Sequence, residues 1–414
     1  MNVYEILTTI IVLATVFAYI NQRWIKLPTT IGIMALSLLS SMVLVILGEI
    51  NATLSDKAIA FVGAIDFQDV LMNFMLSFLL FAGAIHIDAK KLNKERWPVI
   101  VLATLGTLLS TFIIGIITWY IFDLFHTSIP FIYCLLFGAL ISPTDPIAVL
   151  GILKEAKIPS TLELKISGES LFNDGVGVVI FISIAEVARS GNFSAMDVGK
   201  LFMQEAAGGL LFGFLLGYIG YLALRSIDDY KVEVLITLAI VMGGYFIAGY
   251  LHVSGPLAMV VAGIMIGNKL NEEGMSAQTR DYLGKFWELI DEILNAVLFL
   301  LIGFEMLIIK ISSTVLLIGL IAIGIVLLAR WISVFIPVYL LRFKIKFEKN
   351  AIAILTWGGL RGGISVALAL SLGKHMYRDE FVLITYIIVI FSILVQGLTI
   401  GKVSKKLINN KRLV

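Results

Sequence analysis

Long apolar runs separated by short polar segments dominate this sequence and limit what it can fold into. Of the 414 residues, 59% are hydrophobic and only 14% are charged, and the mean hydropathy is +0.99. A soluble domain has roughly 45–50% apolar and about 25% charged residues. This composition excludes a soluble enzyme, because too few polar side chains are present to cover a surface in contact with water. We therefore expect one all-helical membrane domain over residues 1–414, embedded in a lipid bilayer.

Other classes of protein are excluded by what the chain lacks. The net charge is only +2, which gives no reason to expect nucleic acid as a partner. The single cysteine, Cys134, lies in an apolar run and rules out a disulfide framework or a cysteine metal site. The sequence contains neither a phosphate-binding glycine loop followed by Lys-Ser/Thr nor a zinc-protease motif within the apolar runs. We expect a protein that is not an enzyme and that needs no cofactor.

Hydropathy predicts about thirteen membrane-spanning helices of roughly 20 residues each. The predicted spans are 4–21, 28–49, 67–87, 98–124, 129–150, 161–188, 200–224, 232–251, 254–268, 282–306, 311–341, 350–373 and 380–401. The first run follows Glu5 rather than basic residues, so it is interpreted as a retained helix and not as a signal peptide.

The positions of Lys and Arg predict how these spans are oriented. We assume that the N-terminus is outside and count basic residues in the first turn of a span with the adjoining segment. Then 23 of the 31 basic residues fall on the inner side, six fall outside, and Arg330 and Arg361 lie deep within spans. Cytoplasmic loops of membrane proteins are enriched in Lys and Arg. The sequence therefore predicts a multi-pass protein of the cell (inner or plasma) membrane, with the N-terminus outside and a short cytoplasmic tail at 404–414.

Two of the predicted spans contain helix-breaking sequences at matching places. In the fifth span, Pro143 and Pro146 bracket Thr144 and Asp145, and proline removes a backbone donor. In the twelfth, four glycines surround Arg361. Matching interruptions in two halves are typical of secondary transporters with inverted repeats, which here would be approximately 1–190 and 230–403. Where the two broken helices cross, Asp145 would compensate the positive half-helix ends and Arg361 the negative ones.

The sixth span carries the polar residues that are hardest to place in lipid. Helical spacing puts Ser170 and Asp174 on one face and Glu169 with Asn173 on a second. A purely structural network of hydrogen bonds is the alternative interpretation of this cluster. Arg330, within the eleventh span, needs a buried carboxylate partner, and Glu169 is the preferred one. The alternatives are that Arg330 extends to the cytoplasmic edge or that Glu169 pairs with Arg361.

These residues indicate exchange of a cation for a proton. A carboxylate at a helix break, with a hydroxyl and free carbonyl groups nearby, offers the oxygen ligands that small hard cations prefer. If Asp174 holds either a proton or a cation, but not both, a carrier that exposes it alternately to the two sides is an antiporter.

At the same residues the chain resembles the monovalent cation/proton antiporter superfamily, and most closely the NhaP and NHE-type sodium/proton exchangers. The resemblance extends over essentially the whole chain, and its most specific motifs are Thr144-Asp145-Pro146, the segment from Gly168 to Asp174, Phe286-Trp287-Glu288 and Gly359-Leu360-Arg361-Gly362. It implies a thirteen-span inverted-repeat fold, a homodimer and an elevator-like motion.

The resemblance also implies roles for individual residues. Asp174 would bind the proton and the cation, with Ser170, Asn173, Thr144 and Asp145 around it, so that a transported Na⁺ lies at Asp174, Ser170 and Thr144. Glu169 would pair with Arg330, while Asp145 and Arg361 would compensate the crossed half-helices.

The exchange implied is of Na⁺ or Li⁺ for H⁺, in the service of pH and sodium homeostasis. An Asn-Asp pair in the sixth span goes with electroneutral exchange in this family, so Asn173 predicts one-for-one exchange. Some members carry an additional acidic ligand after a Leu-Leu-Phe run in the third span, where this chain has Ala82. A K⁺/H⁺ antiporter on the same fold and a cation channel are the alternatives.

Overall fold

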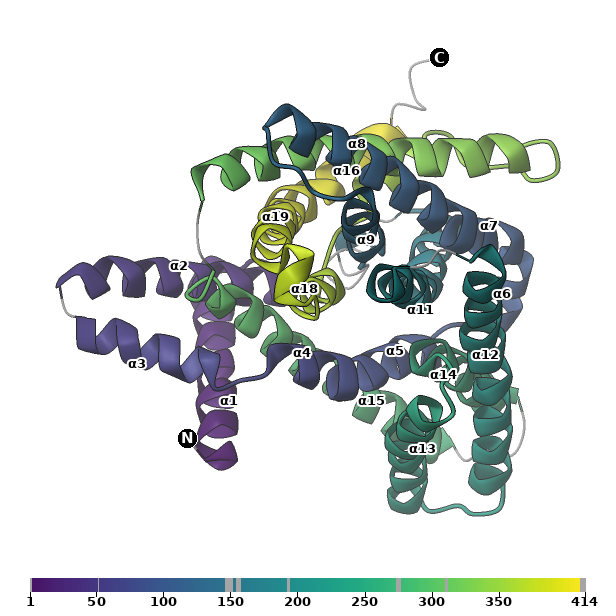
Figure 1. Ribbon diagram of the computed structural model, residues 1–414. Helices are drawn as coiled ribbons and strands as arrows, with labels where there is room; N and C mark the ends of the chain where they lie inside the picture. The colour runs from purple at the N-terminus through teal and green to yellow at the C-terminus, as the bar shows by residue number, and fades with distance from the viewer. Residues whose placement is uncertain are drawn as a thin grey trace.

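The computed structural model describes residues 2–50, 52–145, 152–153, 158–191, 194–272, 277–309 and 312–409. All regular elements within these residues are helices, as expected from the sequence (Figure 1). Nine of the helices in these ranges are long and apolar enough to cross a membrane, and Phe131–Ile141 and Gly255–Asn268 are shorter apolar helices. The prediction of an all-α polytopic membrane protein is confirmed.

The helices follow one another along the chain in this order: α1 (Val3–Ile20), η1 (Asn21–Ile25), α2 (Thr29–Ile50), α3 (Ala52–Gly63), α4 (Phe67–Asp69), η2 (Val70–Met75), α5 (Leu76–Ile85), α6 (Ala89–Lys94), α7 (Arg96–Val101), η3 (Leu102–Gly106), α8 (Thr107–Leu124), α9 (Phe131–Ile141), α11 (Ser160–Ser190), α12 (Ala195–Arg225), α13 (Tyr230–Tyr250), α14 (Gly255–Glu272), α15 (Ala277–Glu305), α16 (Ser313–Leu341), α17 (Ala351–Trp357), α18 (Gly363–Leu370), η4 (Lys374–Met376), α19 (Arg378–Phe391), η5 (Ser392–Gly397) and α20 (Leu398–Asn409).

Three boundaries differ from the sequence prediction. A short helix, α3, occupies part of the segment between the second and third predicted spans. Helix α15 begins at Ala277 rather than at 282, because its first turns are amphipathic and fall below a hydropathy threshold. The last helix continues to Asn409, and Ser404 within it is fully buried. Most of the predicted tail at 404–414 is therefore helical, and residues 410–414 lie outside the described part.

The helices that hold the polar residues form two neighbouring groups (Figure 1). We call α8, α9, α11, α16, α18 and α19 the core group; α9, α11, α18 and α19 lie side by side at the centre of the view, and α8 and α16 run along one edge. We call α5, α12, α13, α14 and α15 the flanking group, whose own apolar cluster surrounds the fully buried Trp287. Asp145 and Asp174 of the first break and α11, together with residues of α15, line one cavity where the two groups meet.

Helix α12 packs closely on α14 through glycines spaced four residues apart, as expected for tight packing between membrane helices. Gly209, Gly213 and Gly217 all lie on the buried face of α12. A Cβ atom at Gly213 would lie 2.5 Å from the carbonyl oxygen of Ala258. Because the obstructing atoms belong to the backbone of α14, a side chain at position 213 forces the two helices apart.

Substitution of Gly213 tests this packing. Gly213→Ala is expected to lower the apparent Tm of the purified protein, with a loss of about 1–3 kcal/mol, as is typical of overpacked sites. Gly199→Ala in the same helix is the matched control, because no atom lies within 4 Å of a Cβ at that position. Scanning fluorimetry in detergent measures both variants. Equal Tm values for the two would contradict the close approach of α12 and α14.

Candidate functional site

The breaks in the fifth and twelfth predicted spans contact each other directly. Helix α9 ends at Ile141, and the chain then runs through Ser142 to Asp145 without helical structure, while α17 and α18 are separated by residues 358–362. The backbone amide of Asp145 donates a 2.8 Å hydrogen bond to the carbonyl oxygen of Leu360. The rest of the fifth predicted span, from Pro146 to residue 150, lies outside the described residues.

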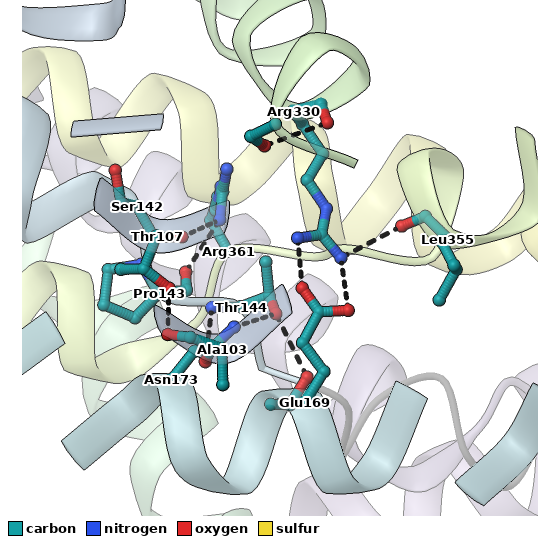
Figure 2. A network of polar contacts seen from close by, with 12 residues as sticks. Ala103, Thr107, Ser142, Pro143, Thr144, Glu169, Asn173, Arg330, Leu355 and Arg361 are labelled. Carbon is teal, nitrogen blue, oxygen red and sulfur yellow. Dashed lines mark hydrogen bonds and ion pairs between the residues drawn. The ribbon is translucent and has the colours of Figure 1, made fainter. Parts of the chain in front are cut away.

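Two charged side chains, Arg361 and Asp145, interact with the helix ends at the two breaks. The Nη1 atom of Arg361 donates to the carbonyl oxygens of Ser142 and Pro143, just after the C-terminal end of α9 (Figure 2). The Asp145 carboxylate occupies the space where Gly362 would carry a Cβ, at the N-cap of α18. A cation at the negative end and an anion at the positive end of a helix are both stabilising. Gly362 is required here because any side chain would displace Asp145.

Helix α11 presents its polar residues to the first break. The backbone amide of Thr144 donates to Asn173 Oδ1 at 3.2 Å, and Asn173 Nδ2 donates to Thr144 Oγ1 at 2.8 Å (Figure 2). The Thr144 hydroxyl also lies 3.0 Å from the Ser170 hydroxyl. Ser170 and Asn173 therefore meet at Thr144, although they were predicted on different faces. Three positions on a helix differ by only about 60°, so both reach the same residue.

Asp174 lies one residue further along α11 and faces an internal cavity of about 860 Å³. Its residue is 7% exposed. No donor from the described residues forms a hydrogen bond to its carboxylate, unlike the carboxylate of Glu169 in the same helix. Asp145 and Gly363 line the same cavity. The acid therefore has access to the cavity and no fixed partner within the described part of the chain.

The opposite wall of the cavity comes from the flanking group. Glu288, Asp291, Glu292 and Asn295 line it from one face of α15, at the spacing that places residues on one side of a helix. These side chains give the wall of the cavity opposite Asp174 an acidic character. On α5 the wall includes Ala82, so no carboxylate reaches the cavity from that position.

Beyond Asp174 the two groups are in close contact. A Cβ atom at Gly175 of α11 would lie 2.6 Å from the side chain of Leu257 in α14, and one at Gly363 of α18 would lie 2.6 Å from Leu298 in α15. Leu257 and Leu298 are both 2% exposed. At these two points the core group and the flanking group are therefore packed directly against each other.

Arg330 of α16 forms the buried ion pair with Glu169 that the sequence argument preferred. Its Nη1 contacts Glu169 Oε1, its Nη2 donates to Glu169 Oε2 at 3.0 Å, and Nη2 also donates to the carbonyl oxygen of Leu355 at 3.2 Å (Figure 2). The two side chains are 7% and 1% exposed. Bidentate pairing is the strong geometry for arginine and carboxylate. The pair joins α11, α16 and the end of α17.

Lys165 is a polar residue whose role the sequence analysis missed. It was counted among the cytoplasmic charges, yet its side chain is only 1% exposed and its Nζ lies 2.9 Å from Glu348 and 3.4 Å from Glu95. Burial raises the pKa of Glu348, but hydrogen bonds from Thr161 and Lys165 outweigh it and hold that pKa below its usual value. A lysine near the start of an apolar run can be either buried or exposed, so the sequence alone does not predict that Lys165 is buried.

Removal of one partner from the buried pair tests its contribution to stability. Glu169→Gln leaves Arg330 buried without a counter-charge, and we expect a loss of about 3–5 kcal/mol, seen as lower yield and lower Tm. The double variant Glu169→Gln/Arg330→Met is expected to recover part of that loss. Lys91→Gln, which breaks an exposed pair with Asp88, is the control and should change Tm little. Normal yield and Tm for Glu169→Gln would show that the pair does not stabilise the fold.

Comparison with known proteins gives the same fold and family. Residues 11–406 match the family model described as sodium/hydrogen exchanger, transmembrane. The chain is 47% identical to the Na⁺/H⁺ antiporter NhaP of Pseudomonas aeruginosa, over 97% of this chain and 96% of that protein. It is 36% identical to the Na⁺/H⁺ antiporter NhaH of Halobacillus dabanensis, over 82% and 84%.

A solved structure extends the likeness to the whole fold. The model superposes on the sodium proton antiporter MjNhaP1 from Methanocaldococcus jannaschii with a TM-score of 0.76, covering 98% of this chain and 99% of that one at 20% identity. The antiporter fold predicted from the two interrupted helices is therefore confirmed. With a family model that covers nearly the entire sequence, this chain belongs to the transmembrane sodium/hydrogen exchanger family.

Proposed function

We propose that the protein is a secondary transporter that exchanges Na⁺, or Li⁺, for H⁺ across the cell membrane. The observation that carries the proposal is Asp174, a carboxylate that has no hydrogen-bond partner among the described residues and faces a cavity beside the two helix breaks. The relatives at 47% and 36% identity are named Na⁺/H⁺ antiporters, which favours Na⁺ over the K⁺/H⁺ alternative.

Asp174 would hold either a proton or the cation in each half of the cycle. The hydroxyl groups of Ser170 and Thr144 lie on the same stretch of α11 and the adjoining break, and they supply neutral oxygen ligands for Na⁺. Asn173 orients Thr144 through two hydrogen bonds and thereby keeps that hydroxyl in place. Asp145 adds negative charge to the same cavity wall. The cation is the transported substrate, and the proposal requires no resident cofactor.

Exchange needs access to Asp174 from one side at a time. The cavity that reaches Asp174 is lined by residues of the segment after α1 and of the middle of α15. We place the segment after α1 on the cytoplasmic side from the distribution of Lys and Arg. The contacts of Gly175 and Gly363 with the flanking group would close the opposite side in this state. A displacement of the core group relative to the flanking group, within a homodimer, would reverse this access.

The central test is substitution of the proposed carrier acid. In proteoliposomes with an imposed pH gradient, wild-type protein is expected to dissipate the gradient on addition of Na⁺ or Li⁺, and more weakly with K⁺. Asp174→Asn should reduce exchange to the level of protein-free liposomes, because an amide neither binds a proton nor balances a cation charge. The yield and Tm of this variant should stay near those of wild type, because no group in the described residues donates a hydrogen bond to the Asp174 carboxylate.

Glu292→Gln provides the matched control, because it removes an exposed carboxylate from the lining of the same cavity. It is expected to retain exchange with a higher apparent KM for Na⁺, since one attracting charge is lost. Wild-type exchange rates in Asp174→Asn would refute the assignment of the carrier. An absence of any cation-dependent proton movement in wild type, at every pH, would refute antiport itself.

The proposal includes a stoichiometry of one proton for one cation. Asn173 is a neutral amide committed to Thr144, so Asp174 is the acid of this pair that can exchange charge. We expect the initial exchange rate to be the same with and without a membrane potential set by K⁺ and valinomycin. A rate that rises with an imposed potential of either sign would show net charge movement and would contradict electroneutral exchange.

A further inference from the structure

A groove separate from the ion cavity lies between the C-terminal half of α16 and α17. Its volume is about 870 Å³, and it shares no lining residue with the cavity at Asp174. Residues of α16, of the hairpin that follows it at 342–350, and of α17 form its walls. The groove belongs to the core group but has no part in the ion site.

One wall of the groove is a row of aromatic side chains that the chain leaves uncovered. Trp331, Phe335 and Tyr339 line the groove, and Phe343 continues the row beyond it. The four residues follow one another at four-residue spacing, and each ring contacts the next with centroids 5.3 to 6.1 Å apart. All four are exposed, from 39% for Phe335 to 80% for Phe343. On a helix of this hydropathy, such a face is in contact with lipid chains, and aromatic rings mark the membrane–water interface.

Basic residues line the end of the groove at the hairpin. Arg342, Lys346 and Lys349 are exposed and line it, and none has a carboxylate within ion-pair distance among the described residues. The one acid of the lining, Glu348, is already paired with Lys165 at 2.9 Å. The mouth of the groove therefore carries positive charge that the described chain does not compensate.

The groove also contains an unused polar atom. The Thr356 side chain lines the groove, and its hydroxyl is buried with no hydrogen-bond partner in the described part of the chain. Thr356 follows Leu355, whose carbonyl oxygen accepts a hydrogen bond from Arg330. A ligand in the groove would thus contact the helix that ends at the second break.

We propose that this groove is a binding site for one anionic phospholipid. Its acyl chains would lie along the row from Trp331 to Phe343, and its phosphodiester would lie among Arg342, Lys346 and Lys349. The arrangement fits a lipid rather than a soluble anion, because the apolar wall is continuous with the basic mouth and lies on a membrane-spanning helix. Basic pockets between membrane helices are known to hold anionic headgroups. A bound lipid would support α17 and, through Leu355, the position of Arg330.

Thermal stability with defined lipids tests this site. Wild-type protein in neutral detergent is titrated with phosphatidylglycerol or phosphatidylcholine, and Tm is measured by scanning fluorimetry. Phosphatidylglycerol is expected to raise Tm at much lower concentration than phosphatidylcholine. Each Lys or Arg near an anionic headgroup is expected to increase the affinity for the lipid about fivefold. The variant Arg342→Gln/Lys346→Gln/Lys349→Gln should therefore need about 100-fold more phosphatidylglycerol for the same shift.

Two further variants separate the groove from diffuse surface charge. Lys344→Gln removes an exposed basic residue of the same hairpin that does not line the groove, and it should respond as wild type does. Ala353→Trp keeps every charge but fills the groove, and it should lose the preference for phosphatidylglycerol.

Three outcomes would overturn the proposal. Equal responses to the two lipids in wild type would remove the preference for an anionic headgroup. If Lys344→Gln reduced the response of Tm to phosphatidylglycerol as much as the triple variant does, the effect would come from the overall positive charge of the surface and not from the groove. A similar rise in Tm with inorganic phosphate alone would identify a soluble anion in place of a lipid.

Discussion

The crossing of two interrupted helices creates an electrostatic problem on which the rest of the fold depends. Backbone groups freed inside a membrane must be satisfied by the protein, since lipid offers no partner. Here Arg361 donates to the carbonyl oxygens of Ser142 and Pro143, and the Asp145 amide donates to Leu360. Each break therefore supplies the groups that stabilise the other, and neither could persist alone.

Helix α11 carries residues that stabilise the fold and, next to them, the acid proposed to bind the transported ions. Glu169 is fixed by Arg330, and Asn173 is fixed by Thr144, so both are already engaged by the fold. Asp174, next in sequence, has no such partner among the described residues and faces the cavity. Fixing the neighbours while leaving one acid accessible is the arrangement that reversible ion binding requires, because a carboxylate held in a permanent ion pair could not exchange its partner.

Much of this arrangement could be predicted from residue types alone. Ionisable groups in apolar runs are costly, and that cost identified Asp174, Glu169, Arg330 and Arg361 before any coordinates were considered. Pairing of Arg330 with Glu169 followed from the need of a buried guanidinium for a carboxylate. The interrupted helices followed from proline and glycine placed within spans.

Other features depend on tertiary contacts that a linear pattern does not contain. The sequence could not show that Lys165 turns inward to Glu348, because a lysine near a helix start is equally compatible with exposure. It also could not show that Ser170 and Asn173 meet at one threonine, since that depends on the path of the broken segment. The groove beside α17 is formed by segments on both sides of a hairpin, and its aromatic row resembles any lipid-facing helix surface.

The side chain at position 82 affects how strongly the proposed carrier could bind a cation. Ala82 is almost fully buried and lines the same cavity as Asp174. At this position the cavity wall therefore carries a methyl group, whereas an aspartate or glutamate would add a carboxylate. With a methyl group at this position, a cation held at Asp174 would have to complete its shell of oxygen ligands from Ser170, Thr144 and water. One residue on α5 thus bears on how tightly such a carrier could hold its cargo and how sharply it could tell one alkali ion from another.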